Sequence, residues 1–353
     1  MKKKQLLFTF VALLVIAALF VWGCRRFHFD FGQLAQQMKL ADWRMVFLGI
    51  GCIYVAYIFR AFRWGYLMRH SKRVSPFSLV GCQVIGFTAV ALIGRVADPV
   101  RPFLVSKKTG SDLSTQFAVY IVERLFDFGS MAIIIFSVIL LSPAGAIPHQ
   151  EIVRKSGLFG IAATLCGGIF LLFVRLAGAW VATLFERLFS LISPRLGHNA
   201  GQKIRAFHAG LDNMRSLRDL VVVLSFSLTM WGLITYAYIA TLRSFVASPE
   251  LASMNLSRGI LILAISGAAS SLQLPIIGWF TQIAFVAASL SGILGVAPEA
   301  ATAAAAILLL VTFLCIIPVG LTWAQFENIS LRSVAEESGH AGSKITDEKQ
   351  SEA

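Results

Sequence analysis

Charged residues are scarce in this chain. Only 14% of its 353 residues are charged, 57% are hydrophobic, and the mean hydropathy is +0.75. A soluble globular protein carries about a quarter charged residues, so this chain has too few polar side chains to cover a water-soluble fold. The composition therefore excludes a soluble enzyme and a disordered regulator. It predicts an all-α polytopic membrane protein, because the apolar runs are long enough for spanning helices rather than barrel strands.

Cysteine is scarce as well. The five cysteines are odd in number, scattered, and lie in or beside apolar runs without any Cys-x-x-Cys pair. A disulfide framework or a cysteine metal site requires regular, paired spacings, so we expect neither, and we expect no cofactor. The cysteine positions are Cys24, Cys52, Cys82, Cys166 and Cys315.

Motifs of soluble catalysis and of nucleic-acid binding are also missing. The sequence has no His-x-x-x-His pair, no P-loop, no Gly-x-Ser-x-Gly and no repeated aspartate motif. The net charge of +13 is not accompanied by a nucleic-acid-binding pattern. It is typical of basic residues that flank membrane helices and face anionic lipid. We expect a protein that is not an enzyme and does not bind nucleic acid.

What the sequence does contain is a series of apolar segments. The first follows Lys2–Lys4 and is longer than a signal-peptide core of about 7–15 residues, so we expect it to be retained. Segments 77–94, 259–274 and 280–297 are short or interrupted by glycine and proline. The apolar segments are 5–24, 43–60, 77–94, 117–141, 157–174, 220–241, 259–274, 280–297 and 301–323.

The distribution of basic residues favours one topology. If all nine segments span, 12 basic residues lie inside and 18 outside, which inverts the positive-inside bias. If 77–116 and 259–297 are re-entrant hairpins from opposite faces, the counts become 22 inside and 8 outside. We therefore predict six full spans and two re-entrant hairpins in the inner membrane, with both termini in the cytoplasm.

The remaining segments complete the predicted domain organisation. Residues 1–330 form one transmembrane domain, within which the basic, amphipathic stretch 175–219 is expected to lie on the cytoplasmic membrane surface. The polar tail 331–353 is expected to be disordered.

The two hairpins predict an inverted repeat. Aligning them sets Gly94 opposite Pro275 and Arg101 opposite Gln282, with Gly278 close behind the proline. Paired apolar segments that glycine and proline interrupt point to the binding site of a transporter.

Three charged clusters lie close to apolar segments, where charges are expensive. The first is Arg60, Arg63 and Trp64, whose spacing places them on one helix face. These residues form either a belt that snorkels to the cytoplasmic surface or a clamp for a lipid phosphate beside an interfacial indole.

The other two clusters contain the acidic residues. Asp98 and Arg101 lie in a stretch broken by prolines, which is either a solvated loop or the lining of a cavity. Glu123, Arg124 and Asp127 lie inside an apolar segment and form either an ion pair at a helix start or an intramembrane network that partners the arginines.

Taken together, these motifs resemble the lysylphosphatidylglycerol synthase transmembrane-region family, a flippase-like domain. The resemblance rests on Arg60-x-x-Arg63-Trp64, on Gly94 through Arg101, and above all on Glu123-Arg124-x-x-Asp127. It covers residues 5 to 325. The family's Gly-Glu pair is replaced here by Ala97-Asp98, and Gln282 stands where the family often has an acid.

The resemblance implies a protein that moves or binds an anionic or polyprenyl-type lipid. Arg60, Arg63 and Arg101 would hold the phosphate, and the acidic residues of the three clusters would orient the arginines. The chain shows no aminoacyl-transferase domain and is not expected to make lysyl-lipid. A non-transporting scaffold for a lipid-modifying enzyme and an integral lipid-modifying enzyme are the alternatives.

Overall fold

The computed structural model describes residues 31–69, 71–141, 216–271 and 277–327, together with isolated positions between 155 and 205. Every regular element in these ranges is a helix. This confirms the all-helical class. The elements are α2 (Phe31–Leu40), α3 (Trp43–Met68), α4 (Pro76–Ile93), η1 (Arg95–Ala97), α5 (Val100–Thr109), α6 (Leu113–Leu141), α9 (Leu217–Arg243), α10 (Pro249–Ala252), α11 (Leu256–Ser271), α12 (Ile277–Leu294), α13 (Pro298–Leu309), η2 (Leu310–Leu314) and α14 (Ile316–Phe326).

Four helical stretches are long and apolar enough to cross a membrane, which identifies a membrane protein. They are Trp43–Met68, Pro76–Ile93, Arg218–Arg243 and Pro298–Phe326. The helix α6 has 29 residues but carries three charged side chains near its middle, Glu123, Arg124 and Asp127. Two of the six predicted spans, 5–24 and 157–174, lie wholly or largely outside the described residues, as do most of 175–219 and all of the tail 331–353.

The first predicted hairpin is a pair of packed helices, α4 and α5, joined by η1. Gly94 ends α4 with φ 83°, a backbone conformation that a side chain would strain. Pro99 and Pro102 do not break the second arm as expected. They lie just before and within the first turn of α5, where the missing N–H has no helical acceptor, so Arg101 is part of a regular helix.

The second predicted hairpin is formed by α11 and α12, which also pack together. Its turn, residues 272–276 with Pro275, lies outside the described residues. Gly278 is buried in the first turn of α12. Gln282 belongs to the same helix rather than to a loop.

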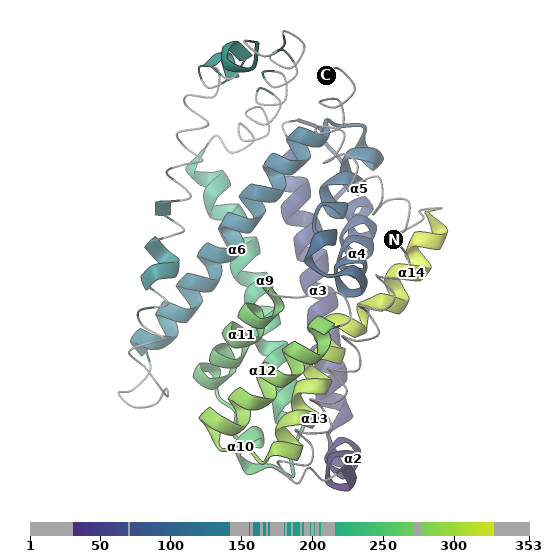
Figure 1. Cartoon of the computed structure of the whole chain (residues 1–353), viewed down its shortest axis with the longest axis vertical. Coiled ribbons are helices and arrows are strands. Elements are labelled where there is room, and N and C mark those ends of the chain that lie inside the picture. Colours follow the sequence, from purple (N-terminus) through teal and green to yellow (C-terminus); the bar gives the residue numbers. More distant parts are fainter. Residues whose placement is uncertain are drawn as a thin grey trace.

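The two hairpins enter the molecule from opposite ends (Figure 1). At one end, Arg69 after α3 forms an ion pair of 2.5 Å with Asp219 in the first turn of α9. At the other end, the backbone N–H of Asp42 before α3 donates to the carbonyl of Ser244 after α9 at 2.7 Å. The helix α3 and its antiparallel neighbour α9 therefore run the full length between these ends, with the α4–α5 hairpin at the upper end of Figure 1 and the α11–α12 hairpin at the lower end.

The two hairpins contact each other in the interior. Arg95 in η1 donates to Ser270 in α11 twice, from Nε to the carbonyl at 3.0 Å and from Nη2 to Oγ at 2.8 Å. Trp279 in α12 donates from Nε1 to the carbonyl of Ala91 in α4 at 2.9 Å. The two halves of the chain are thus joined through their hairpins.

A π-helical segment, η2, interrupts the last long helix between α13 and α14. Such a segment leaves backbone carbonyls without their helical donors. Side chains of the first half supply donors here. Tyr54 donates to the carbonyl of Cys315 at 2.8 Å, and Thr88 donates to the carbonyl of Ile316 at 3.2 Å.

Candidate functional site

Arg60 and Arg63 point into the protein. The helix α3 continues to Met68, eight residues beyond the predicted apolar segment, so both arginines lie inside a long helix packed against α4, α6 and α9. Their exposed fractions are 7% and 1%. The interpretation as a snorkelling belt at the membrane surface is therefore wrong for these two residues.

Their partners come from α6. Glu123 is fully buried and is the eleventh residue of that helix, so it is not part of an ion pair at a helix start. One carboxylate oxygen of Glu123 is shared by guanidinium groups from three helices. The distances to Glu123 Oε1 are 2.9 Å from Arg124, 3.0 Å from Arg63 and Arg101, and 3.4 Å from Arg60.

Asp127 lies one turn further along the same face of α6. Its carboxylate is 2.7 Å from Arg63, 2.9 Å from Arg124 and 3.5 Å from Arg60. Arg63 also donates to the hydroxyl of Ser227 on α9 at 2.7 Å. The predicted network that joins Glu123, Arg124 and Asp127 to the other arginines is thus present in the structure. We call Arg60, Arg63, Arg101, Arg124, Glu123 and Asp127 the buried charge cluster.

Arg101 reaches the cluster from α5 and is completely buried. It passes over Gly86 of α4, where an added Cβ would overlap the arginine stem. Its guanidinium lies 4.5 Å from the ring centroid of Phe87 and 5.1 Å from that of Tyr120, so aromatic faces supply part of its environment. The interpretation of this stretch as a solvated loop is wrong for Arg101.

Asp98 does not join the cluster closely. Its carboxylate is 3.9 Å from both Arg95 and Arg101, and its side chain is 18% exposed. The predicted pairing of Asp98 with Arg101 is therefore a loose ion pair at the margin of the cluster.

Trp64 is a core residue. It has no exposed surface, and its indole N–H donates to Gln116 on α6 at 2.8 Å. The expectation of an interfacial indole beside a lipid is wrong, because α3 continues beyond Trp64 and α4, α5 and α6 cover it. The hydrogen bond satisfies the one polar atom of this side chain.

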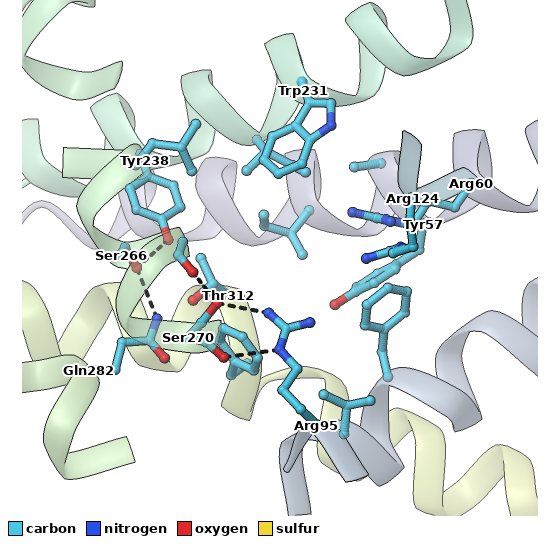
Figure 2. Close-up of a pocket in the computed structure, with 18 residues that line it drawn as sticks. Tyr57, Arg60, Arg95, Arg124, Trp231, Tyr238, Ser266, Ser270, Gln282 and Thr312 are labelled. Carbon is cyan, nitrogen blue, oxygen red and sulfur yellow. Dashed lines mark hydrogen bonds between the residues drawn. The ribbon is translucent and has the colours of Figure 1, made fainter. Parts of the chain in front are cut away.

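A cavity of about 150 Å³ lies beside the charge cluster, where the two hairpins meet. Figure 2 shows Arg60, Arg95 and Arg124 on one side of it and the second half of the chain on the other. No aspartate or glutamate of the described residues lines this cavity. The polar residues facing the arginines are Tyr238, Ser266, Ser270, Gln282 and Thr312.

The polar groups on the wall opposite the arginines are all neutral. Gln282 is buried, and its amide donates to Ser266 Oγ at 2.9 Å, while Tyr238 donates to the same oxygen at 2.8 Å. The carbonyl oxygen of Gln282 and the indole N–H of Trp231 are buried without a hydrogen-bond partner in the described structure. This central cavity thus offers three cations on one side and unsatisfied polar groups on the other.

The sequence analysis missed several residues of this site. Arg95 adjoins the Gly94 turn, and its sequence position next to a helix-ending glycine was the available signal. The other residues are uncharged and lie in apolar segments, where a single hydroxyl or indole is indistinguishable from ordinary helix composition. They are Ser266, Ser270, Trp231 and Tyr238. Only the packing of the two hairpins against each other brings them to the arginines.

Comparison with known proteins identifies a family. The family described as lysylphosphatidylglycerol synthase TM region matches residues 9–320, a range that includes the charge cluster, both hairpins and the central cavity. No curated protein and no solved structure matches the chain significantly. Since the match spans most of the chain, it indicates a lipid-related function in a membrane. The chain belongs to the lysylphosphatidylglycerol synthase TM region family.

Proposed function

We propose that this protein binds a phosphate-bearing lipid in the central cavity and moves it across the membrane. The proposal rests on one observation. Three arginines line the cavity where the two hairpins meet, and no aspartate or glutamate of the described residues lines it with them. A cavity of this charge attracts an anion, and in a membrane the anion at hand is a lipid phosphate.

The arginines have two different roles in this proposal. Arg60, Arg95 and Arg124 line the cavity and contact the phosphate, whereas Arg63 and Arg101 lie behind them. Glu123 and Asp127 hold the guanidinium groups in place, because buried cations are tolerated only when they are paired. The arrangement keeps several arginines fixed around an empty space, so little reorganisation is needed when the phosphate arrives.

The two hairpins provide the moving parts. The contacts of Arg95 with Ser270 and of Trp279 with Ala91 join the α4–α5 hairpin to the α11–α12 hairpin. When these contacts break, the cavity opens to one side of the membrane and the headgroup passes, while the acyl chains remain in the bilayer. The amino-terminal end of α12 adds a positive dipole near the cavity.

The proposed topology has six spans, with the hairpins re-entrant and both termini in the cytoplasm of a cell with an inner membrane. Support comes from the charge distribution. Arg60, Arg63, Arg95 and Arg101 belong to the site and not to surface loops, so they leave the count, and 18 basic residues remain on the cytoplasmic side against 8 on the other. The positive-inside bias persists.

A reconstitution experiment tests the function. The purified protein is placed in liposomes that contain a fluorescent phospholipid, and quenching from outside measures how much lipid has crossed. Wild type should expose the inner-leaflet label within minutes, and Arg60→Gln should slow this exchange at least about tenfold, since one phosphate contact worth about 1.5–3 kcal/mol is lost. Arg44→Gln is the matched control, because Arg44 is exposed at the start of α3.

The competing functions give different results in the same experiment. A scaffold for a lipid-modifying enzyme would not exchange lipid, with or without the substitution. An integral lipid-modifying enzyme would convert a labelled lipid to a new product, which thin-layer chromatography detects. Exchange at the protein-free rate by well-folded wild type would refute the proposal.

A further inference from the structure

The charges around the central cavity do not balance. The buried charge cluster holds four arginines and two carboxylates, and Arg95 and Asp98 at its margin add one charge of each sign. Five cations thus face three anions, which leaves two positive charges. No further ion pair of the described residues joins this set. The charged residues counted are Arg60, Arg63, Arg95, Arg101, Arg124, Asp98, Glu123 and Asp127.

Part of this charge is buried and incompletely bonded. Arg101 is fully buried, yet its Nε and Nη2 make no hydrogen bond in the described structure. The Nε atoms of Arg63 and Arg124 are in the same condition. Arg124 lines the cavity, whereas Arg63 and Arg101 lie behind its wall, so a ligand in the cavity offsets the charge of those two through space rather than by hydrogen bonds. The site therefore gains from a ligand that brings negative charge to the cavity.

The lining of the cavity also limits the charge of the ligand. The cavity of about 150 Å³ has room for a phosphate group. An ammonium-bearing headgroup finds no carboxylate in the cavity lining and would lie beside three arginines.

We infer that the cavity selects a lipid whose headgroup ends in a phosphate monoester, with two negative charges, over phosphodiester headgroups with one. This inference rests on the proposed function and names the substrate class of the same site. A phosphate monoester loses its second proton with a pKa near 6, and the surrounding arginines favour the doubly charged form. Two negative charges bring the site to neutrality, whereas a phosphodiester leaves one buried positive charge without a partner.

Binding of short-chain lipids to the full-length protein in detergent tests this. The probes are dioctanoyl phosphatidic acid, a monoester, and dioctanoyl phosphatidylglycerol, a diester, measured by calorimetry at pH 8 and pH 5. At pH 8 the monoester should bind at least about tenfold tighter, because it pairs one more buried charge. At pH 5 the monoester carries one charge, and most of this preference should disappear.

The pH change acts on the ligand and not on the cavity. The ionisable groups that line it are Arg60 from α3, Arg95 from η1, Arg124 from α6, and the tyrosines Tyr57 and Tyr238. Side chains of these types keep their charge between pH 5 and pH 8. The affinity for the diester should therefore stay constant over this range, which provides an internal control.

A substitution that removes one surplus charge gives a second test. Arg95→Gln should weaken binding of the monoester about tenfold and that of the diester much less, so the preference shrinks. Arg95 is partly exposed, with 32% of its side chain accessible, so the variant should fold, which its thermal unfolding checks. Arg44→Gln removes an exposed arginine and should leave both affinities unchanged.

The outcomes separate this inference from the proposed function. Equal affinity for monoester and diester at pH 8, with lipid exchange intact in liposomes, overturns the inference alone. Absence of binding and of exchange overturns both. Inorganic phosphate is the third probe. If it binds as tightly as the monoester lipid, the site takes free phosphate, and the assignment to a lipid headgroup is wrong.

Discussion

Replacing Glu123 tests whether the buried charge cluster is a structural unit. One oxygen of this residue is within 3.4 Å of four guanidinium groups, and the carboxylate has no exposed surface. Glu123→Ala leaves Arg60, Arg63 and Arg124 with Asp127 as their close carboxylate, and leaves Arg101 with only the loose contact to Asp98. Removing one partner of a buried pair costs about 3–5 kcal/mol, a large share of the roughly 5–15 kcal/mol that stabilises a folded protein.

The conservative variant separates charge from hydrogen bonding. Glu123→Gln retains an oxygen that accepts hydrogen bonds, so it should lose less stability than Glu123→Ala. It should still lose lipid exchange, because the arginines are no longer held by an opposite charge. The matched control is Glu299→Ala at the partly exposed start of α13, which should cost less than about 1 kcal/mol.

The assays are unfolding in a denaturing detergent, which gives the change in free energy, and lipid exchange in liposomes for those variants that fold. The expected order of stability is wild type, Glu123→Gln, Glu123→Ala. Wild-type stability and exchange in Glu123→Ala would refute the reasoning, because a carboxylate shared by three buried arginines and Arg124 cannot be removed without effect unless water already solvates them.

Three further predictions concern the fold. Gly86→Ala should lower the free energy of unfolding by about 1–3 kcal/mol, because the added Cβ overlaps the stem of Arg101. Gly267→Ala should not, because its added Cβ meets open space. Thermal unfolding compares the two variants. In a cysteine-free background, Asp112→Cys should be shielded from an impermeant thiol reagent in intact cells, whereas Val246→Cys should be labelled; the reverse pattern would contradict the topology. Trp64→Phe should cost about 1–3 kcal/mol by leaving a buried amide oxygen unpaired, yet preserve lipid selectivity in the binding assay, because this side chain does not line the cavity.

Some parts of the site could be predicted from single segments. Glu123, Arg124 and Asp127 stand in an apolar run with helical spacing, and a charge in such a run must find a partner. The partners themselves come from α3 and α5, about 20 to 60 residues earlier in the chain. Sequence spacing does not report which helix faces which, so the correct arginine for each carboxylate required the tertiary structure.

By itself, the sequence determined the class of this protein. The low charge content and long apolar runs require a membrane, the apolar runs indicate where most helices lie, and the Glu-Arg-x-x-Asp motif identified the family. These properties are local, because each depends on residues within one or two turns of a helix. The positions of α4 and α11 were predicted within three residues for the same reason.

The tertiary structure decided which polar residues are buried together. Trp64 and Arg63 are adjacent in the sequence and both bond to α6, but Trp64 bonds to Gln116 near the start of that helix, whereas Arg63 bonds to Asp127 about three turns further along. Arg95 and Ser270 are 175 residues apart and meet only because η1 and the end of α11 pack together. Burial depends on what the rest of the chain places against a helix face, and no local pattern carries that information.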